Sequence, residues 1–418
     1  MARIVQKYGG SSVADADRIR TVAARIARTF RAGNEVAVVV SAMGDTTDEL
    51  IALARQVNPD PDPRELDMLM STGETVAATL LSMALHGLGL PAISFTAGQA
   101  GIRTDDQHRR ALMTSVKPER VRRALDQGRI CIITGFQGVN EAGDVTTIGR
   151  GGSDPTAVAV AVGLRAAICE FYKDVDGILT ADPRVVPNAQ KLDVISHEEM
   201  LELANLGAQV LHPRAVELGQ VYGMPLVVRP TFNEGAGTVI RAEEGGMEQY
   251  NRVRGIAHEK NVAKVTVVGV PDRPGIAHRI FQAMADAGIN VDIIVQNVSH
   301  GGVTDMSFTI ADDDLGRAQT LLEPVRTAIG AREISSARGF GKVSIVGTGI
   351  QSHPGYAATM FGTLSAAGIN IQMITTSDIR ITCLIDQDAV EPAARALHAA
   401  FIEEASGGAT QPPLSRLG

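Results

Sequence analysis

The segment Lys7-Tyr8-Gly9-Gly10-Ser11-Ser12 places a lysine and a glycine pair where a short predicted strand, Arg3 to Lys7, leads into a helix. Glycine lets the backbone approach an anion closely, and the free amide groups of a helix start point toward such a ligand. The lysine adds a mobile ammonium that can reach a phosphoryl group. An ordinary turn after a strand has the same composition, so the segment alone leaves both interpretations open.

A second glycine-rich segment, Gly149-Arg150-Gly151-Gly152-Ser153-Asp154, adds a guanidinium and a helix-initiating Ser-Asp pair. These groups predict an anion pocket. The alternative is that Ser153 only caps the next helix and that Arg150 is a solvated loop charge. Two glycine-lined helix starts in one domain favour a site where two anions meet, as a phosphoryl donor and an anionic acceptor must.

Acidic residues follow the next predicted strand, in Lys173-Asp174-Val175-Asp176-Gly177 and then in Asp182-Pro183-Arg184. Doubly wound sheets bind ligands at the carboxyl ends of their strands. Aspartate before Gly or Pro is also a common turn former, so a structural role stays open. His212-Pro213 is interpreted as structural, because none of the nine histidines falls in a metal-ligand cluster.

The apolar pattern predicts the elements that position these segments. Apolar residues recur at helical spacing from Asp17 to Arg31, and Val36 to Val40 is apolar throughout, as in a strand covered on both faces. Strand, helix and buried strand predict a βαβ unit and a parallel sheet between helix layers. Further predicted features are strands at 130–134, 167–172 and 226–229, a hairpin turn at 140–143, and a capping box of Ser196 and Glu199 that starts a helix.

The chain beyond about residue 245 contains a duplication. Lys264 to Gly269 recurs as Lys342 to Gly347, and Gly288 to Val291 recurs as Gly368 to Ile371. Each copy predicts a strand, a Pro-Gly loop, a helix, a turn and a strand, which is typical of an α+β module. Two copies are too few for a solenoid, so we expect paired modules with a shared interface.

Composition excludes several classes of protein. The 418 residues carry 39 Lys+Arg and 47 Asp+Glu, with 4% aromatic residues and no Trp. This balance disfavours a broad nucleic-acid surface and base-stacking platforms. The start lacks a signal-peptide core, and no apolar run approaches the roughly 20 residues of a membrane helix. We therefore expect a soluble, cytoplasmic protein with no membrane or nucleic-acid partner.

The chemistry-bearing segments together resemble aspartokinase in order and spacing. They are Lys7 to Gly10, Val40 to Asp48, Ser71-Thr72-Gly73-Glu74, Gly149 to Asp154, Asp174 to Gly177 with Thr180 to Arg184, and Val210 to Pro213. The duplicated tail resembles the tandem ACT modules of short, monofunctional aspartokinases. The resemblance implies an α/β, three-layer amino-acid-kinase fold with a mainly parallel central sheet over 1–245. Two α+β, ferredoxin-like ACT modules would follow over 262–335 and 340–408, with 251–260 supplying an interleaved strand.

The implied reaction transfers the γ-phosphate of ATP to the β-carboxylate of L-aspartate, giving 4-phospho-L-aspartate, the first step of lysine, threonine and methionine biosynthesis. A side-chain carboxylate has a pKa of about 3.9 and is already ionised at pH 7, so no general base is needed. Catalysis then rests on alignment and charge neutralisation. Mg²⁺ would arrive with ATP, bridging its phosphates rather than occupying a protein cage.

The resemblance also implies residue roles. Lys7 would stabilise the transferred phosphoryl group and Asp154 would orient that lysine. Glu74 would bind the aspartate ammonium and Arg150 its α-carboxylate. The remaining acceptor-site residues would be Thr47, Gly151, Gly152 and Ser153. The ATP-site residues would be Lys7, Tyr8, Gly9, Gly10, Ser41, Lys173, Asp174, Leu179 and Arg184.

Two departures from the family pattern concern charge near the nucleotide. Lys173 stands where the family commonly has Thr, and Gln209 stands where many relatives have a basic residue. We hypothesise that Lys173 compensates for the cation missing at position 209. The same departures motivate a rival interpretation, a catalytically silent amino-acid sensor. A nearer rival is a kinase for glutamate or acetylglutamate, which the paired tail modules and Ser71 to Glu74 disfavour.

In ACT modules the loop after the first strand encloses an amino-acid effector, here expected to be threonine, lysine or both. The effector-site residues would be Asp272, Gly275, Ile276, Ala277, Gln296, Asn297, Thr376 and Asp378. The alternative is that the tail is only a dimerisation platform. The expected assembly is a homo-oligomer through the ACT modules, or association with a separately translated tail subunit started at Met247.

Overall fold

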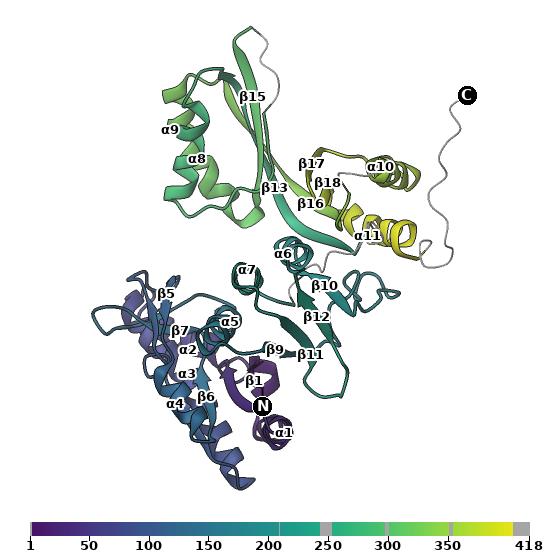
Figure 1. Ribbon diagram of the computed structural model, residues 1–418. Coiled ribbons are helices and arrows are strands. Elements are labelled where there is room, and N and C mark those ends of the chain that lie inside the picture. Colours follow the sequence, from purple (N-terminus) through teal and green to yellow (C-terminus); the bar gives the residue numbers. More distant parts are fainter. Residues whose placement is uncertain (1, 209, 243–252, 297–300, 351–353, 404–418) are drawn as a thin grey trace. The chain divides into compact units, whose positions relative to one another are not determined.

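The computed structural model describes residues 2–208, 210–242, 253–296, 301–350 and 354–403. The chain folds into two compact units (Figure 1). Unit 1 comprises Met1–Leu179, Gln190–Asn205 and Gln209–Gly245, and unit 2 comprises Thr180–Ala189, Leu206–Ala208 and Gly246–Gly418. The two units are therefore not contiguous in sequence.

Unit 1 is built on an eight-stranded sheet in the order β10-β12-β11-β9-β1-β2-β6-β3. Every neighbouring pair is parallel except β11 with β12, which confirms the predicted, mainly parallel sheet. The strands are β1 (Arg3–Tyr8), β2 (Glu35–Val40), β3 (Ala92–Phe95), β6 (Ile130–Thr134), β9 (Ile168–Lys173), β10 (Val194–Ser196), β11 (Leu226–Pro230) and β12 (Thr238–Arg241). A smaller four-stranded sheet contains β4 (Ile102–Thr104), β5 (Met113–Val116), β7 (Gln137–Val139) and β8 (Val145–Thr147).

Helices cover both faces of the large sheet. They are α1 (Ala16–Arg31), α2 (Thr46–Val57), α3 (Pro63–Gly87), α4 (Glu119–Asp126), α5 (Ser153–Leu164), α6 (His197–Asn205) and α7 (Pro213–Tyr222). The apolar stripes of α1 and α3 share one core with Tyr8 and with alternate residues of β2. On the other face of the sheet, α4 contacts β2 and β6, and α5 contacts β1, β2 and β9. The predicted capping box is confirmed at α6, where the backbone N–H groups of Ser196 and Glu199 each bond the other residue's side chain.

Side-chain alternation along β1 and β9 separates the two faces. The register pairs Gln6 with Glu170 and Tyr8 with Tyr172, and the two tyrosine rings stack 4.7 Å apart. Successive side chains of a strand point to opposite faces, so Lys7 lies on the face opposite Tyr8. Its register partner is Phe171, and Lys173, two residues further along β9, lies on the same face as Lys7. That second face is the one where α5 begins.

Helix α3 differs from an expectation drawn from composition. It is the one helix among the described residues with the length and apolar content of a possible membrane span. The expectation that no apolar run reaches this length was wrong, because a long run that tolerates Ser, Thr and Gly is still apolar on average. The buried residues of α3 include Asp67 and Glu74, and the helix packs on α1 and the sheet of unit 1.

Unit 2 is built on a six-stranded antiparallel sheet in the order β14-β15-β13-β16-β18-β17 (Figure 1). Its strands are β13 (Gly255–Pro271), β14 (Ile294–Gln296), β15 (Val303–Ala311), β16 (Glu333–Val346), β17 (Met373–Ser377) and β18 (Arg380–Asp386). Its helices are α8 (Ile276–Asp286), α9 (Leu315–Ile329), α10 (Tyr356–Ala366) and α11 (Val390–His398). The duplicated segments thus form two α+β halves of a single sheet.

The two central strands of unit 2 each serve both halves. Residues 255–259 of β13 pair with 342–346 of β16, while 262–271 pair with β15. Residues 180–189 also belong to this unit: Ala181, Val185 and Val186 pack in the core that contains Val343 and Ile345. A segment that lies inside the first domain by sequence is thus part of the second unit by packing.

Candidate active site

The centre of the candidate site is a buried cluster of Lys7, Asp154 and Lys173. The Lys7 Nζ lies 2.6 Å from one Asp154 oxygen, and the Lys173 Nζ donates to the other at 3.0 Å. Lys7 is near the end of β1, Lys173 ends β9, and Asp154 lies in the first turn of α5. The cluster therefore sits at the carboxyl edge of the parallel sheet, where ligands bind in doubly wound folds.

Burial and charge act in opposite directions within this cluster. Burial and the like charge of Lys173 lower the pKa of Lys7, Asp154 raises it, and the net result is a pKa of about 8. Burial alone would raise the pKa of Asp154, but Lys173 and Lys7 outweigh it and hold that pKa well below its usual range. Two cations share one carboxylate, so one positive charge remains for an anionic ligand.

Close backbone packing joins this cluster to the end of β2. A Cβ on Gly10 would lie 2.9 Å from the Ala42 carbonyl oxygen, so only glycine fits there. The Ser153 hydroxyl hydrogen-bonds the Ser41 hydroxyl at 2.7 Å, and Gly152, without a side-chain cap, precedes the helix. The alternative that Ser153 only caps α5 is therefore wrong, because its hydroxyl bonds across the site instead.

Glu74, in the middle of α3, places a carboxylate beside the residues that follow β2. It is 2% exposed, and its Oε1 accepts a hydrogen bond from the Ala42 amide at 3.1 Å. Its Oε2 is buried and has no hydrogen-bond partner among the described residues. Burial raises the pKa of Glu74 to about 7. A buried carboxylate with a free oxygen favours a cationic ligand.

Arg150 lies in the loop before α5 and pairs with the first turn of α2. Its guanidinium donates to Asp48 at 2.6 Å, and its side chain is 87% exposed. Thr47 precedes Asp48 in the same helical turn. The loop thus presents a solvated guanidinium beside the start of α2.

Comparisons with known proteins agree with this arrangement. The model of the amino acid kinase family matches residues 2–230, and the ACT domain model matches residues 265–324 and 343–401. The chain is 51% identical over 405 residues to the aspartokinase of Mycolicibacterium smegmatis, which covers 96% of each chain. It is 50% identical over 408 residues to that of Corynebacterium glutamicum, again covering 96% of each chain.

The chain belongs to the aspartokinases. Its structure is also similar to that of E. coli aspartokinase III in complex with aspartate and ADP, with a TM-score of 0.80 at 26% identity. That similarity covers 95% of this chain and 99% of the E. coli chain. The enzyme is thus an aspartate kinase with an amino-acid-kinase domain and C-terminal ACT domains.

The residues that the aspartokinase resemblance assigns to ATP are distributed over both units. Tyr8 is fully buried and stacked on Tyr172, on the face opposite Lys7, so only its backbone is available to a ligand at the cluster. Asp174 directly follows β9 and is exposed, and the backbone of Leu179 forms an isolated antiparallel β-bridge with Lys191. Arg184 belongs to unit 2, where its guanidinium pairs with Asp182 at 2.7 Å.

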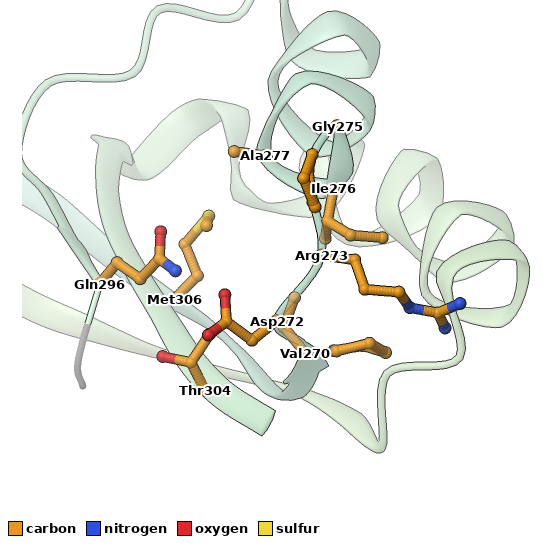
Figure 2. Close-up of a pocket in the computed structure, with 11 residues that line it drawn as sticks. Val270, Asp272, Arg273, Gly275, Ile276, Ala277, Gln296, Thr304 and Met306 are labelled. Carbon is orange, nitrogen blue, oxygen red and sulfur yellow. The ribbon is translucent and has the colours of Figure 1, made fainter. Parts of the chain in front are cut away.

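Unit 2 contains a pocket of about 340 Å³ at the start of α8 (Figure 2). Predicted effector residues line it: Asp272, Gly275, Ile276, Ala277 and Gln296. Figure 2 shows the Arg273 guanidinium extending away from Asp272 and Gln296. The lining residues outside the predicted loop that sequence reasoning missed include Val270, Pro271, Thr304 and Met306. Thr304 and Met306 are two apart on β15, so they share a face of the sheet, but this spacing does not indicate that the face borders a pocket.

The other predicted residues of the aspartokinase tail are separated from this pocket or lie outside the described residues. Thr376 is in β17 and Asp378 follows it, at the opposite edge of the sheet from β14. Asn297, Gln209, Met247 and residues 251–252 are outside the described residues. Within the described part of the chain, no group of three or more His, Cys, Asp or Glu side chains could hold a metal ion.

Proposed function

We propose that this aspartokinase transfers the γ-phosphoryl group of ATP to the β-carboxylate of L-aspartate, giving ADP and 4-phospho-L-aspartate. A carboxylate oxygen forms a bond to the γ-phosphorus while the bond to the β–γ bridging oxygen breaks. The bridging oxygen leaves with the electron pair as part of ADP. No proton has to move, because the carboxylate is ionised at neutral pH.

Lys7 provides the positive charge at the transferred phosphoryl group, and Asp154 orients its ammonium. The backbone of Gly9 and Gly10 approaches the phosphates, with Ser41 at the end of β2. Mg²⁺ enters bound to the ATP phosphates, since this cation keeps several waters and binds substrate phosphates readily. The remaining nucleotide contacts come from Lys173, Asp174, Leu179 and Arg184.

The acceptor lies beside this charge cluster. Glu74 Oε2 pairs with the aspartate ammonium, and Arg150 turns from Asp48 to the α-carboxylate. Thr47, Ser153 and the Gly151-Gly152 backbone complete the pocket. The observation that carries the proposal is the combination of one excess positive charge on the cluster of Lys7, Asp154 and Lys173 and an unpartnered buried oxygen on Glu74. An amino acid with an anionic side chain next to a phosphoryl donor satisfies both.

The experiment is a coupled ADP-release assay with aspartate, glutamate and acetylglutamate. We expect turnover with aspartate, at a kcat/KM about 10²-fold above the other two, because the glutamate side chain is one methylene longer and acetylglutamate has no ammonium for Glu74. Preference for glutamate or acetylglutamate would support another amino-acid kinase. No turnover with any of the three would support the catalytically silent sensor.

We also propose that the ACT modules, over 262–335 and 340–408, bind threonine, lysine or both as feedback inhibitors of lysine, threonine and methionine biosynthesis. The pocket at the start of α8 fits an amino acid, with the positive end of the α8 helix dipole for a carboxylate and Asp272 for an ammonium. A related protein, E. coli aspartokinase III, has been crystallised in complex with lysine and aspartate. An inhibitor must bind the low-activity state more tightly. Titrating each amino acid against activity tests this, and insensitivity to both would leave the dimerisation platform.

Three finer proposals have separate tests. The catalytic domain, 1–245, acts in the cytoplasm. The protein forms a homo-oligomer through its ACT modules, and light scattering would detect this oligomer by its mass. An internal start at Met247 would add a separate tail subunit, and intact mass of natively expressed protein would reveal it. The exchange between Gln209 and Lys173 predicts altered ATP KM in Gln209→Lys and Lys173→Thr, and an unchanged KM in both would refute it.

A further inference from the structure

The nucleotide contact proposed for Lys173 does not account for its position beside Asp154. It ends β9, two residues after Phe171, which is in register with Lys7, so the two lysines project from the same face of the sheet. Its Nζ lies 3.0 Å and 3.4 Å from the two oxygens of Asp154. Its side chain is 19% exposed, against 5% for the other two members of the cluster. Asp154 is therefore held between two ammonium groups from neighbouring strands.

A second ammonium changes what Lys7 can do. To neutralise the phosphoryl group in the transition state of transfer, the Lys7 ammonium must shift from Asp154 toward the phosphoryl oxygens. With Lys7 as its only cationic partner, Asp154 would then be a buried, unpaired carboxylate, which is a costly state. Lys173 removes this obstacle, because its contacts to Asp154 do not depend on Lys7. The His212 amide, 3.3 Å from Asp154 Oδ2, adds a neutral donor on the same side.

We infer that Lys173 is a positioning residue of phosphoryl transfer: it keeps the Asp154 carboxylate paired while the Lys7 ammonium moves from that carboxylate to the transferred group. This inference rests on the proposed function and deepens it. A lysine that served only as an ATP contact would act on nucleotide affinity alone. A positioning lysine acts on kcat and on the protonation of Lys7.

The electrostatic consequence can be measured. The charged and titratable groups that face Lys7 are Asp154 from α5 and Lys173 and Cys169 from β9. Burial lowers the pKa of Lys7, Asp154 raises it and the like charge of Lys173 lowers it, for a net pKa of about 8. Removing the charge at 173 therefore raises the pKa of Lys7. Lys7 acts as a cation, so activity is lost as pH rises through its pKa, and this loss must move to higher pH when the charge at 173 is removed.

The test compares Lys173→Met and Lys173→Arg with the wild type in kcat and in the pH profile of kcat/KM for ATP. We expect Lys173→Met to lower kcat about 10- to 100-fold, the range of one charge-assisted hydrogen bond. Its alkaline limb should move to higher pH, and Lys173→Arg should restore both the limb and most of kcat. The matched control is Lys117→Met, an exposed lysine just before α4 in the same unit, which should change neither quantity.

Other outcomes would overturn the inference. A higher KM for ATP with kcat and the alkaline limb unchanged would make Lys173 a nucleotide contact only. A lower kcat with an unmoved limb and no rescue by arginine would make its role merely structural. Lys173→Gln provides a second neutral variant if Lys173→Met does not fold. A wild-type chain that fails to phosphorylate aspartate would refute the proposed function instead, before any variant is measured.

Discussion

Lys7 of unit 1 and Lys342 of unit 2 are both almost fully buried, at 4% and 5% exposure, and their charge surroundings are opposite. Lys7 shares the single carboxylate of Asp154 with a second lysine. Lys342 has two carboxylates to itself, Glu259 and Asp292, each at 2.5 Å. One cluster carries an excess positive charge and the other an excess negative charge.

The pKa values move in opposite directions as a result. Burial lowers the pKa of Lys7 to about 8, because Asp154 does not make up for desolvation and for Lys173. Burial would also lower the pKa of Lys342, but Glu259 and Asp292 outweigh it and raise that pKa. Burial alone therefore does not distinguish the two lysines. The number of counter-charges does, since an undercompensated lysine is completed by an anionic ligand.

The largest expected effect tests the undercompensated side of the comparison. Lys7→Met should lower kcat by about 10²- to 10³-fold or more, because the transferred phosphoryl group loses its buried cation. Thermal stability should change little, since Lys173 still pairs with Asp154. The ADP-release assay and thermal denaturation measure the two quantities. A kcat within tenfold of the wild type would remove Lys7 from the mechanism.

The next effect concerns Glu74, the undercompensated anion of the same unit. Glu74→Gln should raise the KM for aspartate about 10²-fold, through loss of the ion pair with the substrate ammonium. In the wild type, the KM should also rise as pH falls through about 7, where Glu74 takes up a proton. The KM of the Gln variant should lack this pH dependence. Equal pH profiles for the two proteins would contradict the assignment.

The same substitution should stabilise the fold. The pKa of Glu74 is raised from 4.5 to about 7, so the folded state binds a proton more tightly than the unfolded state. Wild-type stability contributed by this group is therefore lost as pH rises from about 4.5 through about 7. At pH 8, Glu74→Gln should increase the free energy of unfolding by on the order of 1–3 kcal/mol. At pH 5, the two proteins should unfold at similar urea concentrations.

A smaller effect is expected in unit 2. Asp272→Asn should raise the inhibition constant of the effector about tenfold, because a charge-assisted hydrogen bond to its ammonium becomes a neutral one. The matched control is Asp313→Asn, an exposed aspartate after β15. Titration calorimetry with threonine and with lysine measures the change directly. Unaltered binding of both amino acids would exclude Asp272 from the effector site.

The smallest effect tests the overcompensated lysine. Lys342→Met should lower the free energy of unfolding by only about 1 kcal/mol, because Glu259 and Asp292 are about 40% and 45% exposed and water solvates them. Its kcat should match the wild type. Urea denaturation and the ADP-release assay provide the measurements. A loss of activity comparable to that of Lys7→Met would end the distinction between the two lysines.

Local patterns predicted much of the fold. The all-apolar run of β2, the capping box at α6 and the duplicated tail are signals spread over a few residues, and each is confirmed. Two glycine-rich helix starts indicated an anion site, because their chemistry depends on consecutive residues. The local pattern left a cap open as the alternative role of Ser153, and only the structure excludes it, because the partner of Ser153 is Ser41, 112 residues away.

Long-range packing was beyond the reach of these patterns. Sequence assigns residues 180–189 to the first domain, yet their apolar side chains join the core of unit 2. Neither Thr304 nor Met306 carries a motif, and they line the pocket only because β15 lies beside the start of α8. Such contacts depend on which surfaces meet after folding.

The order of residues along the chain is sufficient for the enzyme class, the mainly parallel sheet and the identity of the charged groups. The enzyme class follows from the resemblance of the motifs to aspartokinase, and the sheet was predicted from the local apolar pattern. The balance of charge around Lys7 is different in kind. It depends on the register of β1 against β9 and on where α5 begins, which together bring Lys173 to Asp154 across 19 residues. Electrostatic energy depends on distance in space and on burial, and both are properties of the folded molecule.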